Sequence, residues 1–470
     1  MKWTRSRAVR AVGCTGVLAA LALAGVAVPA GASPGAVARP RTELLSSTPA
    51  GAPGAGRSYA GALSPGGRYA VFDSEAADLV PGDTNGTQDV FVRDLSTGLV
   101  ERVSVASDGG QAGGYSISGG ISADGRFVTF SSEADNLVPG DTNGAEDVFV
   151  RDRRTGRTER ISTGDPAQPQ TGGSGSPVIS WDGRYVAYDS GRADLVPGDT
   201  NQVADVFVFD RRTGATRRAS VGVGGAEADR ASVNPVLSSD GSRVGFTSKA
   251  GNLLPGGPAT PAARAGGDGP GTGPAARAAA EGPGITKPQT YPYYVHDLRT
   301  GRTEGGSLGS DGVLASANAG YLSPDGRRVV FTTRSSDIVP GDTNGLLDVF
   351  VRDLATGTTR LVSSAQDGTA SNGMSYDPVI TADGRSVFFT SEADSLVPGD
   401  TNAVSDVFRR DLVTGRVERV SVAADGGQTA GASSGPSVDA LGAVVVFGSE
   451  DGTLAAGDTN GAPDAFARRL

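Results

Sequence analysis

Sulfur and imidazole groups are nearly missing from this chain. Its 470 residues include one cysteine, one histidine, two methionines and two tryptophans. Cys14 lies within a segment that resembles an export signal, so the mature chain would hold no thiol for a disulfide or a thiolate nucleophile. Any Ser-His-Asp arrangement would depend on His296 alone, and zinc sites built from several histidines are excluded.

Long hydrophobic runs are also scarce, and the one near the N-terminus is short. Four basic residues lie among the first ten, an apolar run follows over 16–28, and Ala30 and Ala32 then match the pattern that a signal peptidase accepts. We therefore expect a signal peptide over 1–32, a short linker over 33–40 and a secreted protein of the cell envelope or the medium. An uncleaved anchor is the alternative. The run is shorter than the roughly 20 residues of a membrane helix, so we expect no membrane insertion after signal cleavage.

Positive charge is the scarcer sign. The chain has 42 lysines and arginines against 52 aspartates and glutamates, which gives a net charge of −10. Loss of the basic signal segment would leave the mature chain more acidic still. Such a surface disfavours nucleic acid and anionic lipid and suits cations or basic partners.

One sequence unit recurs along the chain. A Gly-Asp-Thr-Asn segment is followed by a sequence close to Asp-Val-Phe-Val-Arg-Asp. The Asp of the Gly-Asp-Thr-Asn segment lies at positions 83, 141, 199, 342, 400 and 458. These positions are 58 residues apart except for one step of 143, which fits two periods plus an insertion of 27 residues in a degenerate copy. Repeats of this length are copies of one supersecondary unit stacked on one another.

Each unit predicts four β-strands. Tight Asp-Gly turns such as Asp124-Gly125 precede short apolar runs such as 127–130, which is typical of strands joined by hairpins. In the second unit we expect strands near 116–121, 126–131, 147–151 and 158–162. Four antiparallel strands with short connections form a propeller blade. The seven units therefore predict an all-β, seven-bladed β-propeller over 41–470; a solenoid would need capping repeats, and none is recognisable.

The two ends of the repeat region complement each other. The last unit stops at its third strand, 465–470. Residues 41–47 resemble the sequence of 100–105, which is the expected fourth strand of the first unit. The N-terminal strand is thus predicted to complete the last blade, which leaves no free sheet edge. Residues 256–290, within the fourth unit, are rich in Gly, Ala and Pro, and we expect a disordered insertion; a flap over a ligand is the alternative.

The Ser-Pro-Asp-Gly-Arg turns, as at Ser323 to Arg327, and the apolar strands that follow them resemble the TolB-like, WD-like propeller repeats of bacterial periplasmic and secreted proteins. The resemblance covers 42–470. It implies the propeller fold and is silent on activity, since such propellers include scaffolds, receptors, lyases and hydrolases. The protein that gives the family its name is an envelope protein that contacts other proteins.

Each Gly-Asp-Thr-Asn loop offers an Asp, an Asn two residues later and a second Asp four residues after that. Oxygen ligands in alternating positions on a loop suit Ca²⁺, so we predict calcium sites on one face of the ring. The same residues also favour Asx-turns without any metal, and the second Asp could pair with Arg93 or its equivalents. The predicted metal ligands are Asp83, Asn85, Asp89, Asp141, Asn143, Asp147, Asp199, Asn201, Asp205, Asp342, Asn344, Asp348, Asp400, Asn402, Asp406, Asp458, Asn460 and Asp464.

Two functions remain open from the sequence. The first is a secreted, monomeric, non-enzymatic propeller that acts as a scaffold or binding module for a protein or a cell-surface glycan, stabilised by calcium. The alternative is a secreted polysaccharide-active enzyme, a glycosidase or lyase, that uses carboxylates on the propeller face. No residue stands out as catalytic. Those that break the repeat are interpreted as packing variation: Trp181, Tyr293, Tyr294, Arg334 and Met374.

Overall fold

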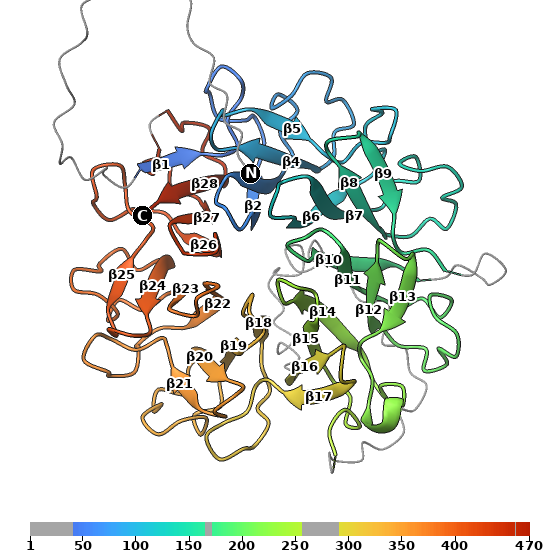
Figure 1. Cartoon of the computed structure of the whole chain (residues 1–470). Helices are drawn as coiled ribbons and strands as arrows, with labels where there is room; N and C mark the ends of the chain where they lie inside the picture. The colour runs from blue at the N-terminus through green and yellow to red at the C-terminus, as the bar shows by residue number, and fades with distance from the viewer. Residues whose placement is uncertain (1–40, 165–171, 256–290, 456) are drawn as a thin grey trace, which may run out of the picture. The chain divides into compact units, whose positions relative to one another are not determined.

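The computed structural model describes residues 41–164, 172–255, 291–455 and 457–470. The predicted signal peptide, the linker and the insertion over 256–290 lie outside the described residues. The described chain forms seven four-stranded antiparallel sheets arranged around a ring (Figure 1), which confirms the predicted all-β, seven-bladed propeller. No helix among the described residues is long and apolar enough to cross a membrane.

Each blade runs from the centre of the ring outwards (Figure 1). The first blade consists of β2 (Ser58–Leu63), β3 (Tyr69–Ser74), β4 (Asp89–Asp94) and β5 (Val100–Arg102). The next five blades are β6 (Ser116–Ile121), β7 (Phe127–Ser132), β8 (Asp147–Asp152) and β9 (Arg157–Arg160); β10 (Ser174–Ile179), β11 (Tyr185–Ser190), β12 (Asp205–Asp210) and β13 (Ala215–Arg218); β14 (Ser232–Leu237), β15 (Arg243–Ser248), β16 (Tyr293–Asp297) and β17 (Arg302–Gly305); β18 (Ala319–Leu322), β19 (Arg328–Thr333), β20 (Asp348–Asp353) and β21 (Thr359–Leu361); and β22 (Ser375–Ile380), β23 (Ser386–Ser391), β24 (Asp406–Asp411) and β25 (Val417–Arg419). The seventh blade combines β26 (Ser433–Val438), β27 (Val444–Ser449) and β28 (Asp464–Arg469) with β1 (Arg41–Leu44).

The core lies between the blades. The second and third strands of a blade are buried on both faces, and an aromatic ring from one strand stacks on a ring from the next, as Phe72 does on Phe91 at 5.5 Å between centroids. Phe72 and Phe91 also pack against Val446 and Ala465 of the seventh blade. Each blade is therefore held by its neighbours, as stacked repeats require.

The Ser-x-Asp-Gly turns fix the hairpin between the first two strands. In the second blade, Ser122 Oγ donates to Asp124 Oδ1 at 2.6 Å and accepts the backbone N–H of Phe127 at 2.9 Å. Gly125 takes a φ of +70°, where a side chain would be strained and would also meet the ring of Tyr69 in the first blade. The repeated turn residues thus set both the hairpin and the close contact between blades.

The N-terminal strand closes the ring. β1 pairs with β28 in antiparallel register, from Arg41 opposite Arg469 to Leu44 opposite Phe466. The Leu45 N–H continues the ladder to the carbonyl of Ala465 at 2.8 Å, and the Leu45 side chain is fully buried. The predicted closure is confirmed: the last blade is built from both ends of the repeat region.

Truncating Leu45 should weaken the closure without removing a strand. We expect Leu45→Ala to lower the free energy of unfolding by about 2–5 kcal/mol, because it leaves a cavity in the contact between the first and last blades. Leu99→Ala is the matched control, since Leu99 is 72% exposed; its effect should stay within about 0.5 kcal/mol. Urea unfolding of both variants measures the difference, and equal effects would show that the N-terminal strand contributes nothing to the core.

Candidate functional site

The structure brings the predicted Asp-Asn-Asp residues of a loop together. In the first blade, Asn85 Nδ2 donates to Asp89 Oδ2 at 2.9 Å, and Asn85 Oδ1 accepts the N–H of Thr87 at 3.2 Å. Asn85 also donates to the carbonyl of Ala112, on the segment leading to the next blade. The Asn-to-Asp contact recurs from Asn143 to Asp147, Asn201 to Asp205, Asn402 to Asp406 and Asn460 to Asp464.

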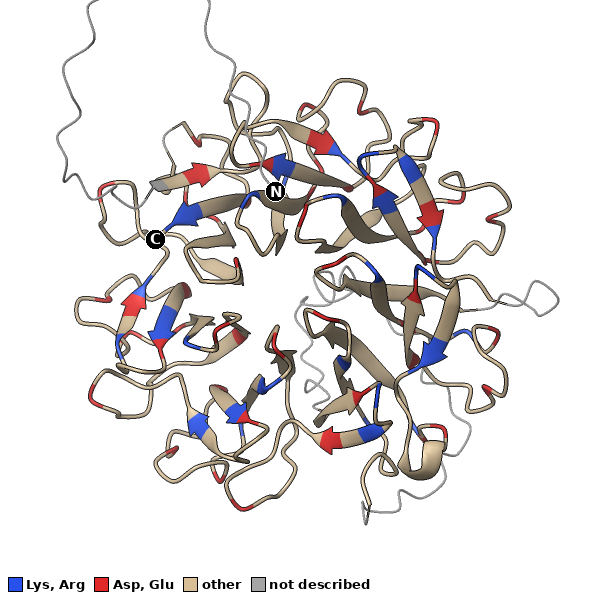
Figure 2. Ribbon diagram, viewed as in Figure 1, with Lys and Arg blue, Asp and Glu red and all other residues tan. Residues whose placement is uncertain are grey.

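Figure 2 shows basic residues on outer strands of the ring, and an arginine of the outermost strand lies between the two carboxylates. Arg102 Nη1 is 3.1 Å from Asp83 Oδ1 and 3.3 Å from Asp89 Oδ2. Sequence reasoning named Arg93 for this role, but Arg93 Nη1 instead donates to Ser47 Oγ at 2.8 Å. The same carboxylate-bridging position is taken by Arg160 in the second blade, Arg218 in the third and Arg419 in the sixth.

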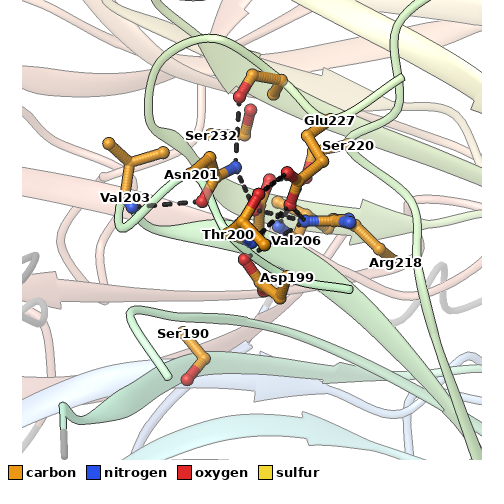
Figure 3. Close-up of polar contacts among 12 residues, drawn as sticks. Ser190, Asp199, Thr200, Asn201, Val203, Val206, Arg218, Ser220, Glu227 and Ser232 are labelled. Carbon is orange, nitrogen blue, oxygen red and sulfur yellow. Dashed lines mark hydrogen bonds and ion pairs between the residues drawn. The ribbon is translucent and has the colours of Figure 1, made fainter. Parts of the chain in front are cut away.

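The third blade shows the complete arrangement (Figure 3). Arg218 Nη1 lies 3.3 Å from Asp199, 3.2 Å from Asp205 and 2.7 Å from Glu227. Ser220 Oγ donates to the other oxygen of Asp205 and accepts the N–H of Val206 at 3.0 Å. Both carboxylates of the pair are almost fully buried, so the loop aims its charges into the blade and away from solvent.

Burial and mutual repulsion set the acidity of the first carboxylate in each pair. Burial, with the charge of Asp205 second, raises the pKa of Asp199 to about 6 despite the nearby Arg218 guanidinium. The same causes raise the pKa of Asp83 and Asp141. Within the described part of the chain, no group of three or more His, Cys, Asp or Glu side chains is placed to hold a metal ion. Calcium binding by these loops therefore stays a prediction, and in four blades a guanidinium already lies where the cation would go.

Three blades, the fourth, the fifth and the seventh, lack the arginine; in the seventh blade Leu44 stands at its position, paired with Phe466. The fourth blade loses the whole set: Pro292 and Gly305 stand in register where the first blade has Asp89 and Arg102. The fifth blade keeps both carboxylates, Asp342 and Asp348, but has Leu361 at the arginine position.

The symmetry-breaking residues do not assemble into one site. His296 is buried in β16, with Nδ1 2.9 Å from Thr303 Oγ1, and burial lowers its pKa. Tyr293 and Tyr294 belong to the core between blades, and Arg334 Nη2 contacts the sulfur of Met374 at 3.2 Å. Packing accounts for Tyr293, Tyr294 and His296, whereas Arg334 is exposed and Met374 half-buried.

The described residues do form a central pocket of about 210 Å³ that sequence reasoning missed. All seven blades line it, mainly with the apolar ends of their innermost strands, such as Leu63, Ile121 and Ile380. Trp181 joins the lining from the turn between β10 and β11. The available signal was the apolar residue that closes each innermost strand, together with a lone tryptophan in a turn that elsewhere holds Ala, Ser or Pro.

Backbone hydrogen bonds join the turns around this central pocket. The N–H of Ala123 donates to Trp181 O at 2.8 Å, and the N–H of Trp181 donates to Ser239 O at 3.0 Å. Further bonds run from Ser239 to Pro324, from Ala382 to Ala440 and from Ala440 to Pro65. Pro324 and Pro65 have no N–H, so neither can donate the equivalent hydrogen bond to the turn of the following blade. The rim is otherwise held rigidly, and Trp181 is fixed by its main chain on both sides.

Comparisons with known proteins found distant structural similarities and no match to a family model or a curated protein. A solved oligogalacturonate lyase from Vibrio parahaemolyticus is 13% identical with a TM-score of 0.49, and the match covers 92% of this chain and 97% of that one. An oligogalacturonate lyase in complex with manganese is 12% identical, at a TM-score of 0.47 and a coverage of 92% and 90%. A putative TolB from Agrobacterium tumefaciens is 15% identical, at a TM-score of 0.37 and a coverage of 79% and 94%. At such identities and TM-scores these likenesses carry no conclusion about the activity of this chain.

Removing a bridging arginine should destabilise its blade. We expect Arg218→Leu to cost about 3–5 kcal/mol at pH 8, because Asp199 and Asp205 then stay buried without a counter-charge. The cost should shrink towards pH 5, where protonation relieves the repulsion. Arg217→Leu, at the exposed neighbouring position of β13, is the matched control and should cost under about 1 kcal/mol. Urea unfolding at both pH values measures the effects; similar losses in the two variants would contradict the bridging role.

A buried carboxyl near the centre gives a second pH prediction. Asp73 accepts the N–H of Ser118 at 2.8 Å, and burial raises its pKa to about 7. The folded state thus binds this proton more tightly than the unfolded state, so this group's contribution to stability falls as pH rises from about 4 to 7.

Asp73→Asn keeps the acceptor oxygen and removes the charge. We expect it to raise the free energy of unfolding by about 1–3 kcal/mol at pH 8 and to change it little at pH 4. Thermal or urea unfolding across that range provides the measurement. If Asp73→Asn were less stable than the parent at pH 8, the prediction would be wrong, and the charged Asp73 carboxylate would be well solvated in the folded protein.

Proposed function

We propose that this chain is an exported, non-enzymatic propeller that binds a protein or a glycan at its central pocket. One observation supports this above the others: the pocket is lined by all seven blades, and a single half-buried tryptophan, Trp181, breaks the repeat there. An indole offers a flat apolar face together with an N–H donor, which suits a sugar ring or an apolar side chain of a partner.

The positions of the carboxylates support a polysaccharide-active enzyme less well than a binding protein. A glycosidase site needs two carboxyl groups that flank the bond to be cleaved. Among the described residues that line the central pocket, Asp439 is the one carboxylate, and its Oδ1 accepts the N–H groups of Ala443 and Val444 at 2.6 and 3.0 Å. The loop carboxylates point into their blades. The enzymatic reading is therefore the weaker proposal.

Related proposals follow from the sequence. We propose that the chain is exported to the cell envelope or medium through its N-terminal segment, that it acts as a monomer without binding nucleic acid, and that it belongs with the TolB-like propellers. The acidic net charge of −10 supports the absence of nucleic-acid binding, and the Ser-Pro-Asp-Gly-Arg turns support the grouping with TolB-like propellers.

Trp181 supplies the readout for the test. Of the two tryptophans, Trp3 would leave with the signal peptide, so emission from the mature chain would report Trp181 alone. We expect a saturable change in this emission when oligosaccharides or peptides that fit the pocket are titrated. Both Trp181 variants lose this fluorophore, so isothermal titration calorimetry compares their affinities with that of the parent. Trp181→Ala should lower the affinity at least about tenfold with little change in melting temperature, and Trp181→Phe should lose less, because it keeps an aromatic face.

A control variant lies outside the pocket lining. Tyr59→Ala removes an aromatic side chain that is 37% exposed and is not among the residues lining the central pocket, so binding should be unchanged. Binding that survives Trp181→Ala would contradict the proposed site. Cleavage of any polysaccharide in the same panel would contradict the non-enzymatic role.

A further inference from the structure

The fifth blade differs from its neighbours at one buried point. Its loop keeps the carboxylates of Asp342 and Asp348, which are 5% and 0% exposed. The position that faces them on the outermost strand is Leu361, paired with Phe350 as Arg102 is paired with Phe91. Two buried negative charges therefore remain without the guanidinium that bridges them in four other blades.

The oxygens left without a donor are the two that arginine contacts elsewhere. Among the described residues, Asp342 Oδ1 and Asp348 Oδ2 have no hydrogen-bond partner. In the first and second blades the corresponding Oδ1 and Oδ2 atoms lie 2.8 to 3.3 Å from a single Arg Nη1. Buried, unpartnered charged oxygens are costly and rare, so a positively charged group is expected at this point.

Further oxygens belong to residues next to this position. In the first blade Arg102 Nη2 also donates to the carbonyl of Gly82 at 3.3 Å, and Gly341 is its counterpart in the fifth blade. Ser371 Oγ is 3.1 Å from Asp348 Oδ1 and stands where the first blade has Ala112. Asn344 donates to the carbonyl of Ser371 at 2.9 Å, and its amide is not among the donors to Asp348.

The approach from solvent is also less crowded. Gln111 and Glu227 cover the loops of the first and third blades by accepting the N–H of Thr84 and Thr200. Ala370 occupies the equivalent bridge position in the fifth blade, opposite Ser364 as Gln111 is opposite Val105. A short side chain there leaves room for water to complete the coordination of an ion.

We propose that the fifth blade holds one hard divalent cation of the Ca²⁺ class, between Asp342 Oδ1 and Asp348 Oδ2, in the position that arginine takes in its neighbours. Two carboxylates balance a divalent charge, and the ligands are all oxygen. Ca²⁺ tolerates irregular geometry at 2.3–2.6 Å, so a small inward shift of each carboxylate from the arginine-bound spacing suffices. With few protein ligands, we expect a dissociation constant of roughly 0.1–1 mM, typical of extracellular modules.

This site is independent of the ligand proposed for the central pocket. It also narrows the prediction of six calcium loops to one. The seventh blade likewise lacks the arginine, but both oxygens of Asp464 are already hydrogen-bonded, to Ser46 and to Asn460, and Asp458 is less buried than Asp342.

Equilibrium dialysis of the chelator-treated chain against CaCl₂, together with thermal unfolding, tests the proposal. We expect about one Ca²⁺ per chain and a rise in melting temperature of about 1–3 °C in millimolar CaCl₂. Leu361→Arg supplies the missing guanidinium, so it should abolish binding and raise the melting temperature of the metal-free protein. Leu361→Met changes the shape without adding charge and should bind as the parent does.

Asp342→Asn gives a second route should the arginine variant fold poorly, and it should lower the affinity at least about tenfold. No bound Ca²⁺ at 10 mM would overturn the proposal, leaving a proton shared by the two carboxyl groups. Unchanged binding in a folded Leu361→Arg variant would overturn it as well. Five or six ions per chain would overturn the single-site assignment in favour of metal at every loop.

Discussion

The structure depends on one buried aspartate at the start of the third strand of a blade, of which Asp89 is the first example. This carboxylate is fully buried, and removing it from water would be costly without partners. A serine, an asparagine and an arginine supply those partners. The arginine lies on the outermost strand, the serine just after that strand and the asparagine in the loop before the third strand, so one carboxylate fixes these parts of a blade relative to one another. The asparagine also donates a hydrogen bond to the segment that leads to the next blade, so the same set of residues links neighbouring blades.

The exceptions show that these residues work as a set. Where the fourth blade loses the aspartate, it also lacks the arginine, so neither charge is left alone in the interior. The fifth blade lacks the arginine while both carboxylates remain, and each of these carboxylates keeps one oxygen without a hydrogen-bond partner among the described residues. The loss of the arginine is hard to recognise in the repeated sequence, because a leucine such as Leu361 is an ordinary residue in a β-strand. The register of β20 and β21 places it opposite the charges.

The sequence was sufficient for the fold because each local signal repeated. The Asp-Gly turns, the apolar runs and the split last blade all depend on residues near one another in the chain or on the period itself. The partner of the loop aspartates was not predictable in the same way. Arg93 and Arg102 both recur in the repeat, and only the twist and register of the outer hairpin decide that Arg102 faces the loop while Arg93 reaches the neighbouring blade. The central pocket was missed because its lining comes from seven distant segments, each an unremarkable strand end.

The contrast between loops and pocket bears on how a symmetric ring acquires a function. The loops are rich in groups capable of chemistry, but they use them to satisfy one another, so their repetition reflects the stability of each blade. The turns around the centre are held by backbone bonds that tolerate most side chains, and Trp181 keeps both of its main-chain bonds. A position whose backbone is fixed and whose side chain is free can change without loss of the fold. Specific recognition in this protein is therefore expected at the rim of the central pocket, where one blade can differ from the other six at little cost in stability.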